Sequence, residues 1–263
     1  MTGARLEGIG VTKHFGGLTA VEDVTVAATP GHVAALIGPN GAGKTTLFQC
    51  LTGGERPDAG RVLLDGRDIT RLTADARARL GIGRTFQRLA VFPSMTVLDN
   101  LRVGAENRSN APAVLRIGGM LLGILGIVRE DSAPTRRADE VIDVLGLGEV
   151  RDEVTGSLPT GTLRLVELGR ALCHGPRVLL LDEPASGLDT TETEHLQRVL
   201  RQVAADGVAV LLVEHDVDLV FDVADHVYAM AEGQLIASGA PADVRRHPAV
   251  LEAYLDVVTE EGA

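Results

Sequence analysis

The sequence predicts an α/β fold built around a parallel β-sheet that is covered on both faces. Three apolar runs, 32–38, 178–182 and 208–215, have the density of Val, Leu, Ile and Ala that is typical of strands buried on both sides. Between the last two runs, residues 190–207 place apolar side chains at helical spacing on one face. A strand, a helix and a second strand in this order indicate a βαβ unit and therefore an α/β core.

The first part of the chain contains a glycine-rich turn between a strand and a helix. The run 32–38 leads through this turn into "KTTLFQCLTG" (44–53), which predicts a helix that Gly53 ends. Residues 60–66, "GRVLLDG", then predict a further strand and a turn.

The middle of the chain has a different pattern. From about Met95 to Leu172 the sequence shows helical patterns and no convincing strand. The segment 135–147 is amphipathic, and a further helix is predicted from Thr162 onward. We therefore expect a helical insertion between the two halves of the sheet domain.

These patterns predict one domain, 1–263, with three parts. The α/β core comprises 1–94 and 173–240, and the helical subdomain comprises 95–172. Residues 241–263 form a C-terminal helical tail, in which 241–256 predict one or two short helices.

The charge balance argues against nucleic acid as the main partner. The chain has 36 acidic and 25 basic residues, for a formal net charge of −11. Proteins that bind nucleic acid through its phosphates need clustered positive charge. The longest basic runs here are Arg136-Arg137 and Arg245-Arg246, so we expect no nucleic-acid partner.

The remaining bulk features favour a soluble chain. Cys50 and Cys173 lie in apolar helical patterns, which is typical of small buried side chains in a reducing cytoplasm. The N-terminus lacks a charged start followed by an apolar run, so no secretory signal is predicted. The longest apolar stretch, 117–128, is too short and too rich in glycine to span a bilayer. Such a chain can still bind to a membrane protein.

The segment "GPNGAGKT" (38–45) fits the phosphate-binding pattern G-x-x-x-x-G-K-[ST]. Its glycines allow a tight turn whose N–H groups surround phosphates, and the following helix points its positive end at the same place. Lys44 can reach the β- and γ-phosphates, and Thr45 can hold Mg²⁺. A chance glycine-rich turn is the alternative. The expected ATP-binding residues here are Gly38, Pro39, Asn40, Gly41, Ala42, Gly43, Lys44, Thr45 and Thr46.

Two carboxylates follow the apolar run 178–182. Asp182 ends that run, at the edge where parallel sheets bind ligands, and it can hold Mg²⁺ through water. Glu183 is placed to polarise an attacking water. The alternative is a strand that ends in a solvated acidic turn.

With these motifs the chain resembles the ATP-binding cassette (ABC) ATPases over nearly its whole length. This family has a P-loop NTPase core, a helical subdomain and an antiparallel β portion near the N-terminus, and we expect the same here. The resemblance implies that Phe15 stacks on adenine, that Gln87 touches Mg²⁺ and the water, and that His215 contacts the γ-phosphate. It also implies that "SGLD" (186–189) is exchanged between two subunits. Taken alone, Phe15 could be a core aromatic, Gln87 a surface residue and His215 a structural strand-end residue.

The subtype resembles the ATPases of branched-chain amino-acid importers. The stretches that show this resemblance are "FGGLTAVEDV", the long insertion after "DNLRVG", the stretch from "VEHDVDLV" to "GAPADV", and "HPAVLEAYL". The lipopolysaccharide-export ATPases share part of the tail and rank second, because their insertion is shorter. Two further alternatives are a soluble ABC protein that acts in translation or DNA repair and a regulatory subunit without catalytic activity.

One motif departs from the family pattern. In this family a Leu-Ser-Gly-Gly-Gln signature binds the γ-phosphate held by the other subunit, through its serine and glycine N–H groups. This signature aligns with Leu158, Pro159, Thr160, Gly161 and Thr162. Proline supplies neither a hydroxyl nor an N–H, so closure on ATP is expected to be weakened there.

The resemblance also implies cofactors and partners. ATP and Mg²⁺ are expected, with Thr45, Gln87 and Asp182 as metal ligands and Glu183, His215 and Gln87 as catalytic residues. We expect a second ABC ATPase subunit, in a heterodimer, and integral membrane permease subunits. The expected location is the cytoplasmic face of the cell membrane.

Overall fold

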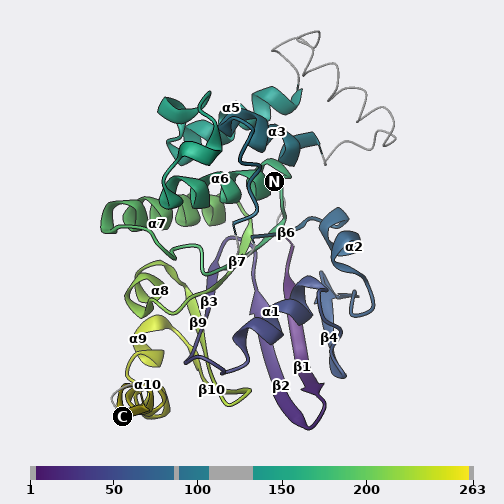
Figure 1. Cartoon of the computed structure of the whole chain (residues 1–263). Coiled ribbons are helices and arrows are strands. Elements are labelled where there is room, and N and C mark those ends of the chain that lie inside the picture. Colours follow the sequence, from purple (N-terminus) through teal and green to yellow (C-terminus); the bar gives the residue numbers. More distant parts are fainter. Residues whose placement is uncertain (1–3, 86–88, 107–132, 261–263) are drawn as a thin grey trace. The chain divides into compact units, whose positions relative to one another are not determined.

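The computed structural model describes residues 4–85, 89–106 and 133–260. It divides into two compact units (Figure 1), and each is described by itself. Unit 1 comprises Met1–Gln87 with Arg177–Ala263, and unit 2 comprises Arg88–Pro176.

Unit 1 contains a six-stranded sheet in the order β10-β9-β3-β8-β7-β6. The pairs from β9 to β6 are parallel, and β10 pairs antiparallel with β9. The strands are β3 (Val33–Ile37), β6 (Ile82–Arg84), β7 (Val178–Asp182), β8 (Ala209–Val213), β9 (His226–Ala231) and β10 (Gln234–Gly239). Every residue of β3, β7 and β8 is buried, as their continuous apolar runs predict.

A second, four-stranded sheet in unit 1 is antiparallel, in the order β2-β1-β4-β5. Its strands are β1 (Leu6–Phe15), β2 (Leu18–Ala28), β4 (Ala59–Leu64) and β5 (Arg67–Asp68). A parallel sheet with an added antiparallel sheet and flanking helices confirms the predicted α/β fold class.

Helix α1 (Lys44–Thr52) belongs to the core that both sheets share. Its Leu47, Phe48 and Leu51 are buried in one hydrophobic cluster with side chains of β1, β2, β3 and β8. Gly53 ends the helix in the left-handed conformation, as the sequence predicts. This packing fixes the end of α1 from which the phosphate loop extends.

The other end of α1 is held by a buried arginine. Arg77 of α2 (Ala74–Arg79) is 1% exposed. Its guanidinium donates to the carbonyl oxygens of Cys50 at 2.7 Å, Leu51 at 2.6 Å and Thr70 at 3.1 Å. Because the last carbonyls of a helix lack partners within it, this cation stabilises the C-terminus of α1.

The described residues of unit 1 also form the helices α7 to α10, which Figure 1 labels. Asp189 caps α7 in a reciprocal capping box with Glu192. The helices are α7 (Thr190–Ala205), α8 (Val217–Val223), α9 (Pro241–Val244) and α10 (Pro248–Glu260). In the described part of the chain, none of the helices has the length and apolar composition needed to cross a bilayer.

Unit 2 is helical in its described residues. It contains α3 (Val97–Glu106), α5 (Ala133–Leu145), the short 3₁₀ turns η1 (Gly148–Val150) and η2 (Thr155–Ser157), and α6 (Thr160–Cys173). Helix α6 begins at Thr160, earlier than the predicted start at Thr162, because Pro159 already takes the cap position.

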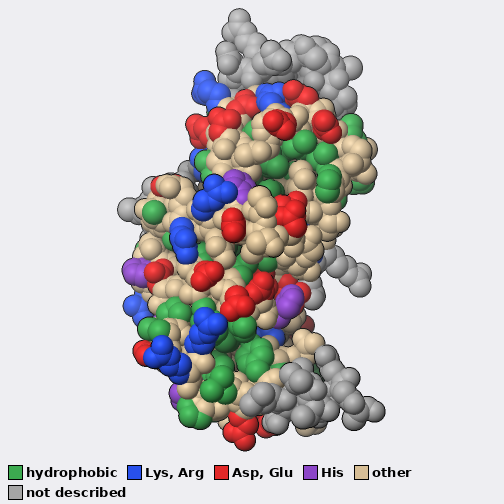
Figure 2. Space-filling model, turned by 90° about the vertical axis from the view of Figure 1, so that its left-hand side faces the viewer, with side chains coloured by type: hydrophobic (Ala, Val, Ile, Leu, Met, Phe, Trp, Pro, Cys, Tyr) green, Lys and Arg blue, Asp and Glu red, His purple; other side chains and the backbone are tan. Residues whose placement is uncertain are grey.

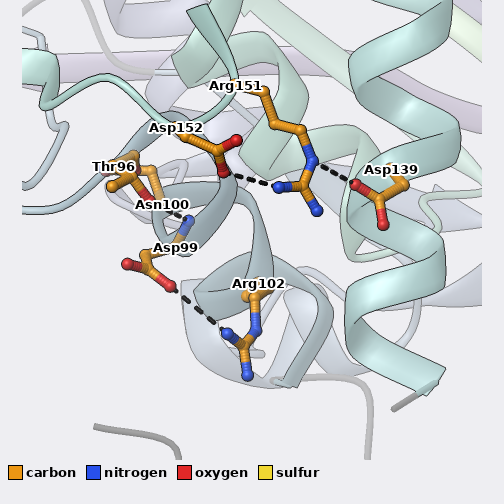
Figure 3. Close-up of polar contacts among 7 residues, drawn as sticks. All are labelled: Thr96, Asp99, Asn100, Arg102, Asp139, Arg151 and Asp152. Carbon is orange, nitrogen blue, oxygen red and sulfur yellow. Dashed lines mark hydrogen bonds and ion pairs between the residues drawn. The ribbon is translucent and has the colours of Figure 1, made fainter. Parts of the chain in front are cut away.

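Polar contacts hold the loops of unit 2 (Figure 3). Asn100 is fully buried and its amide nitrogen donates to the carbonyl oxygen of Thr96 at 3.0 Å. The guanidinium of Arg151 joins Asp139 at 2.9 Å and Asp152 at 2.6 Å. Because Asp139 belongs to α5, this arginine ties the chain after η1 to that helix.

Candidate functional site

Three strands of the six-stranded sheet end at the same level. Leu36 of β3 and Asp182 of β7 both pair with Val213 of the strand between them, β8. Because these strands are parallel, the segments that follow them leave from one edge of the sheet. The structure thus brings together the phosphate loop, the pair Asp182-Glu183 and His215.

Glycine is required at two points of the phosphate loop. Gly38 has φ +151°, and a Cβ there would lie 2.2 Å from the carbonyl oxygen of Met230. Gly43 has φ +95°, and its Cβ would lie 2.3 Å from the carbonyl oxygen of Ala20. Both distances are far too short for a side chain, so the backbones of β9 and β2 approach the two ends of the loop too closely for any residue but glycine.

Lys44 folds back against its own loop. It is 8% exposed, and its Nζ donates to the carbonyl oxygens of Gly38 at 2.6 Å and Pro39 at 2.9 Å. Burial lowers the pKa of Lys44, while the nearby carboxylates of Glu183 and Asp182 act in the opposite direction. No side chain caps the N-terminus of α1, so this helix end and the ammonium group both face an incoming anion.

Asp182 is nearly buried at the end of β7, with 5% exposure. Its backbone N–H donates to the hydroxyl of Thr85 at 3.3 Å, and the N–H of Thr85 donates to the carbonyl of Leu180 at 3.0 Å. The segment after β6 is thereby tied to this carboxylate. Gln87 follows two positions later and lies outside the described residues.

Glu183 has an unusual backbone conformation. Its φ of +49° lies in the left-handed region, which a non-glycine residue adopts at a cost and which is enriched at functional sites. The N–H of Glu183 donates to the carbonyl of Val213 at 2.9 Å, so the ladder between β7 and β8 continues to this residue. The loop 186–189 follows and ends at the cap of α7.

His215 follows β8, and its side chain is 61% exposed. Beside it lies Glu214, which has no exposed surface. Burial raises the pKa of the Glu214 carboxyl, while N–H groups of Ala185 and His215 act in the opposite direction. Glu214 is not among the site residues that the sequence predicts. The available signal was a carboxylate directly attached to a continuous apolar run.

Phe15 ends β1 and is 47% exposed. The Nζ of Lys13 lies 5.3 Å from the centre of this ring. An exposed ring beside a cation is available to stack on a flat aromatic ligand.

The residues 158–162 lie in unit 2, at the start of α6. Pro159 is the N-cap residue, and no side chain caps this helix. The N–H of Leu163 donates to the carbonyl of Pro159 at 3.0 Å. An uncapped N-terminus of a 14-residue helix therefore stands where a serine hydroxyl is expected in the family.

The oxygen ligands available suit Mg²⁺ bound together with phosphates. In the parts of the chain that the structure describes, no group of three or more His, Cys, Asp and Glu side chains could hold a metal by itself. Mg²⁺ is usually held by one or two protein oxygens plus phosphates and waters. The hydroxyl of Thr45 and the carboxylate of Asp182 fit that requirement.

Comparison with known proteins identifies the class. Residues 21–186 match the family model of the ABC transporters, and residues 234–255 match the model of the branched-chain amino acid ATP-binding cassette transporters. The chain therefore belongs to the ABC transporter family, as an ATP-binding cassette ATPase.

Its relatives include ATP-binding proteins of branched-chain amino acid transport and of lipopolysaccharide export. The chain is 37% identical over 254 residues to the high-affinity branched-chain amino acid transport ATP-binding protein BraF of Pseudomonas aeruginosa, covering 95% of this chain and 97% of BraF. It is 36% identical over 250 residues to LivG of Escherichia coli, covering 94% and 95%. A lipopolysaccharide export ATP-binding protein, LptB of Acidithiobacillus ferridurans, is 34% identical over 243 residues, covering 92% and 93%.

Solved cassettes share the fold. The ADP conformation of an ATP-binding cassette of an ABC transporter superposes with a TM-score of 0.81 at 32% identity, covering 97% of this chain and 99% of that one. The resemblance to this family is thereby confirmed for the fold and for the class of protein.

Proposed function

We propose that this chain is the ATP-hydrolysing subunit of an importer for branched-chain amino acids or similar small polar solutes. The proposal is supported by the branched-chain family model over 234–255 and by the relatives BraF and LivG. The lipopolysaccharide-export alternative has a weaker basis, since LptB is slightly less similar.

The proposed ATP hydrolysis is supported mainly by the shared register of Leu36, Val213 and Asp182. It places the phosphate loop next to the carboxylates, with Lys44 close to both. In the proposed complex the loop N–H groups, Lys44 and the N-terminus of α1 bind the β- and γ-phosphates.

The remaining residues act on the water and the metal. Thr45, Asp182 and Gln87 would hold Mg²⁺, which neutralises charge on the phosphates when it is bound. Glu183 takes a proton from the attacking water. His215 and Gln87 contact the γ-phosphate and the water from the neighbouring segments, and Phe15 stacks on the adenine.

The signature region makes the proposed dimer asymmetric. Pro159 removes a hydroxyl and an N–H from a site that acts on the ATP of the other subunit. One hydrogen bond to a charged group contributes roughly 1.5–3 kcal/mol, so closure on that ATP weakens by about 10- to 100-fold. In a heterodimer, ATP bound to Lys44 meets the partner's signature, and only the partner's ATP meets Pro159.

The partners in this proposal are a second ABC ATPase and integral membrane permease subunits, with the chain at the cytoplasmic face of the membrane. Nucleic acid is not among them. Acidic and basic side chains are interspersed over the face drawn in Figure 2, unlike the continuous basic stripe that follows a phosphate backbone.

The test is reconstitution with the membrane subunits encoded by neighbouring genes. We expect this chain to co-purify with them, and we expect ATP-driven uptake of labelled leucine or a related solute into proteoliposomes. Extraction of lipopolysaccharide without solute uptake would favour the export alternative. Purification without any membrane subunit would favour a non-transport ABC protein.

A further inference from the structure

The carboxylate of Glu214 accepts hydrogen bonds from the loop after β7 and from the segment after β8. Its Oε1 accepts a hydrogen bond of 2.8 Å from the N–H of Ala185, and its Oε2 accepts one of 3.2 Å from the N–H of His215. Oε2 also lies 3.7 Å from the Nδ1 of His215. The residue itself is anchored, because its N–H donates to the carbonyl of Leu36 on β3 at 3.3 Å.

A carboxylate in this position is costly. Glu214 has 0% exposure, and burial of a charge is unfavourable unless hydrogen bonds replace its water. An apolar residue would end a buried strand such as β8 without this cost. The two main-chain N–H groups that replace the water come from different segments of the chain, so the carboxylate links them.

The linked segments are those that carry the proposed catalytic side chains. Ala185 lies two residues after Glu183, whose own N–H donates to the carbonyl of Val213 at 2.9 Å. The other segment carries His215. The loop after β7 is therefore joined to the end of β8 by main chain and to the segment after β8 by the Glu214 side chain.

We propose that Glu214 is a positioning residue that holds the loop after Glu183 and the segment of His215 at a fixed separation. It does not touch the nucleotide and acts through these two residues. This inference rests on the proposed roles of Glu183 and His215. Because small displacements of reacting groups lower rates steeply, loss of the link slows hydrolysis without weakening ATP binding.

Two variants of Glu214 separate this role from a contribution to stability alone. Glu214→Gln keeps the size but retains only one acceptor oxygen, so one of the two N–H groups loses its partner. Glu214→Met removes the carboxylate altogether and leaves the N–H groups of Ala185 and His215 without their acceptor, which lowers the free energy of unfolding. A residue that only stabilises the fold would lower the melting temperature, Tm, but would leave the turnover number, kcat, unchanged while the variant is folded.

The experiment measures MgATP hydrolysis by the transporter assembled with its membrane subunits. We expect kcat to fall by about 10- to 100-fold in Glu214→Met and by less in Glu214→Gln, with KM for ATP changed by no more than about twofold. The Tm of Glu214→Met is expected to fall, so kcat is measured at a temperature at which circular dichroism shows the variant to be fully folded. Asp225→Asn is the matched control, because Asp225 also accepts a main-chain N–H, from Val33 at 2.8 Å, but at the opposite end of β3.

A double-mutant cycle tests whether Glu214 acts through His215. In a His215→Ala background, Glu214→Gln is expected to lower kcat by a smaller factor than it does in the wild-type background. Fully multiplicative effects would overturn the proposal, as would a normal kcat in both Glu214 variants. Normal hydrolysis in Glu183→Gln and His215→Ala would instead overturn the proposed function, together with the role of Glu214.

Discussion

The ammonium group of Lys44 donates a hydrogen bond of 2.6 Å to the carbonyl oxygen of Gly38, the first residue of the phosphate loop. The cation is thus already held inside the loop. A phosphate oxygen carries a full charge and is a stronger acceptor than a peptide carbonyl. We infer that bound phosphates take over the donors that Lys44 now gives to its own backbone.

Replacement of Lys44 by Ala is expected to weaken MgATP binding by at least about tenfold, because a charge-assisted hydrogen bond contributes roughly 1.5–3 kcal/mol. The fold is expected to change little. Titration calorimetry measures the affinity, and circular dichroism checks the fold. Arg71→Ala, an exposed cation of unit 1, is the control, and an unchanged affinity in Lys44→Ala would refute the assignment of 38–45.

Loss of Arg77 is expected to destabilise unit 1. Arg77→Met leaves the carbonyl oxygens of Cys50 and Leu51 without their buried donor, at a cost of roughly 2–5 kcal/mol in the free energy of unfolding. Urea unfolding measures this change. Arg79→Met on the same helix is the control, since the Arg79 side chain is 76% exposed. Equal stability of the two variants would contradict the capping role of Arg77.

Both cysteines are expected to be unreactive in the folded protein. Burial raises the pKa of Cys50 to about 11 and that of Cys173 to about 12. At pH 8 a thiol reagent should therefore label them only after denaturation. Because the unfolded chain ionises first, these thiols favour folding fully below the unfolded pKa near 9.0, and stability falls as pH rises toward 11. Rapid labelling of folded protein at pH 8 would contradict this account.

The sequence predicts the buried strands of unit 1 better than the exposed ones. The run 178–182 coincides with β7 because all five of its residues are buried, so its apolar pattern is unbroken. In β1 buried and exposed positions alternate irregularly over Leu6–Phe15, and the antiparallel sheet was expected only from the family resemblance. The sequence patterns do not predict β9 or β10: β10 has no fully buried residue, and β9 buries only Val227, Ala229 and Met230. The domain boundaries near 95 and 172 stay a prediction.

Repair of the signature is expected to strengthen self-association. The triple variant Pro159→Ser, Thr160→Gly, Thr162→Gln restores the family pattern at both sites of a homodimer at once. The purified wild-type chain is expected to hydrolyse ATP slowly and to dimerise weakly on ATP. Light scattering and ATPase rates, with and without the partner ATPase, measure both effects.

The effect of this repair depends on the partner. With the partner present, ATP bound to Lys44 meets an intact signature, so the triple change should matter less. A tight ATP-bound homodimer of the wild-type chain, which the repair does not improve, would mean that Thr160 or the backbone replaces the lost contacts. The interpretation of 158–162 as a degenerate site would then be wrong.

Some functional residues can be recognised in the sequence, and others only once the tertiary structure is known. The pattern of 38–45 is local, so the sequence reveals it directly. Nothing in "ADARAR" distinguishes Arg77, which is buried, from Arg79, which is exposed. Glu214 likewise becomes informative only when its acceptors meet the N–H of Ala185, 29 residues away along the chain. The placement of Gln87 lies outside the described residues and stays a prediction.

Glu183 is proposed to supply the base for ATP hydrolysis at this site, and the decisive variant is Glu183→Gln in the assembled transporter. We expect MgATP to bind with unchanged affinity while turnover falls by about 10²–10⁴, the range for a positioned general base. Glu194→Gln, an exposed glutamate of α7, is the control and should hydrolyse ATP normally. Turnover at the wild-type rate in Glu183→Gln would contradict the account.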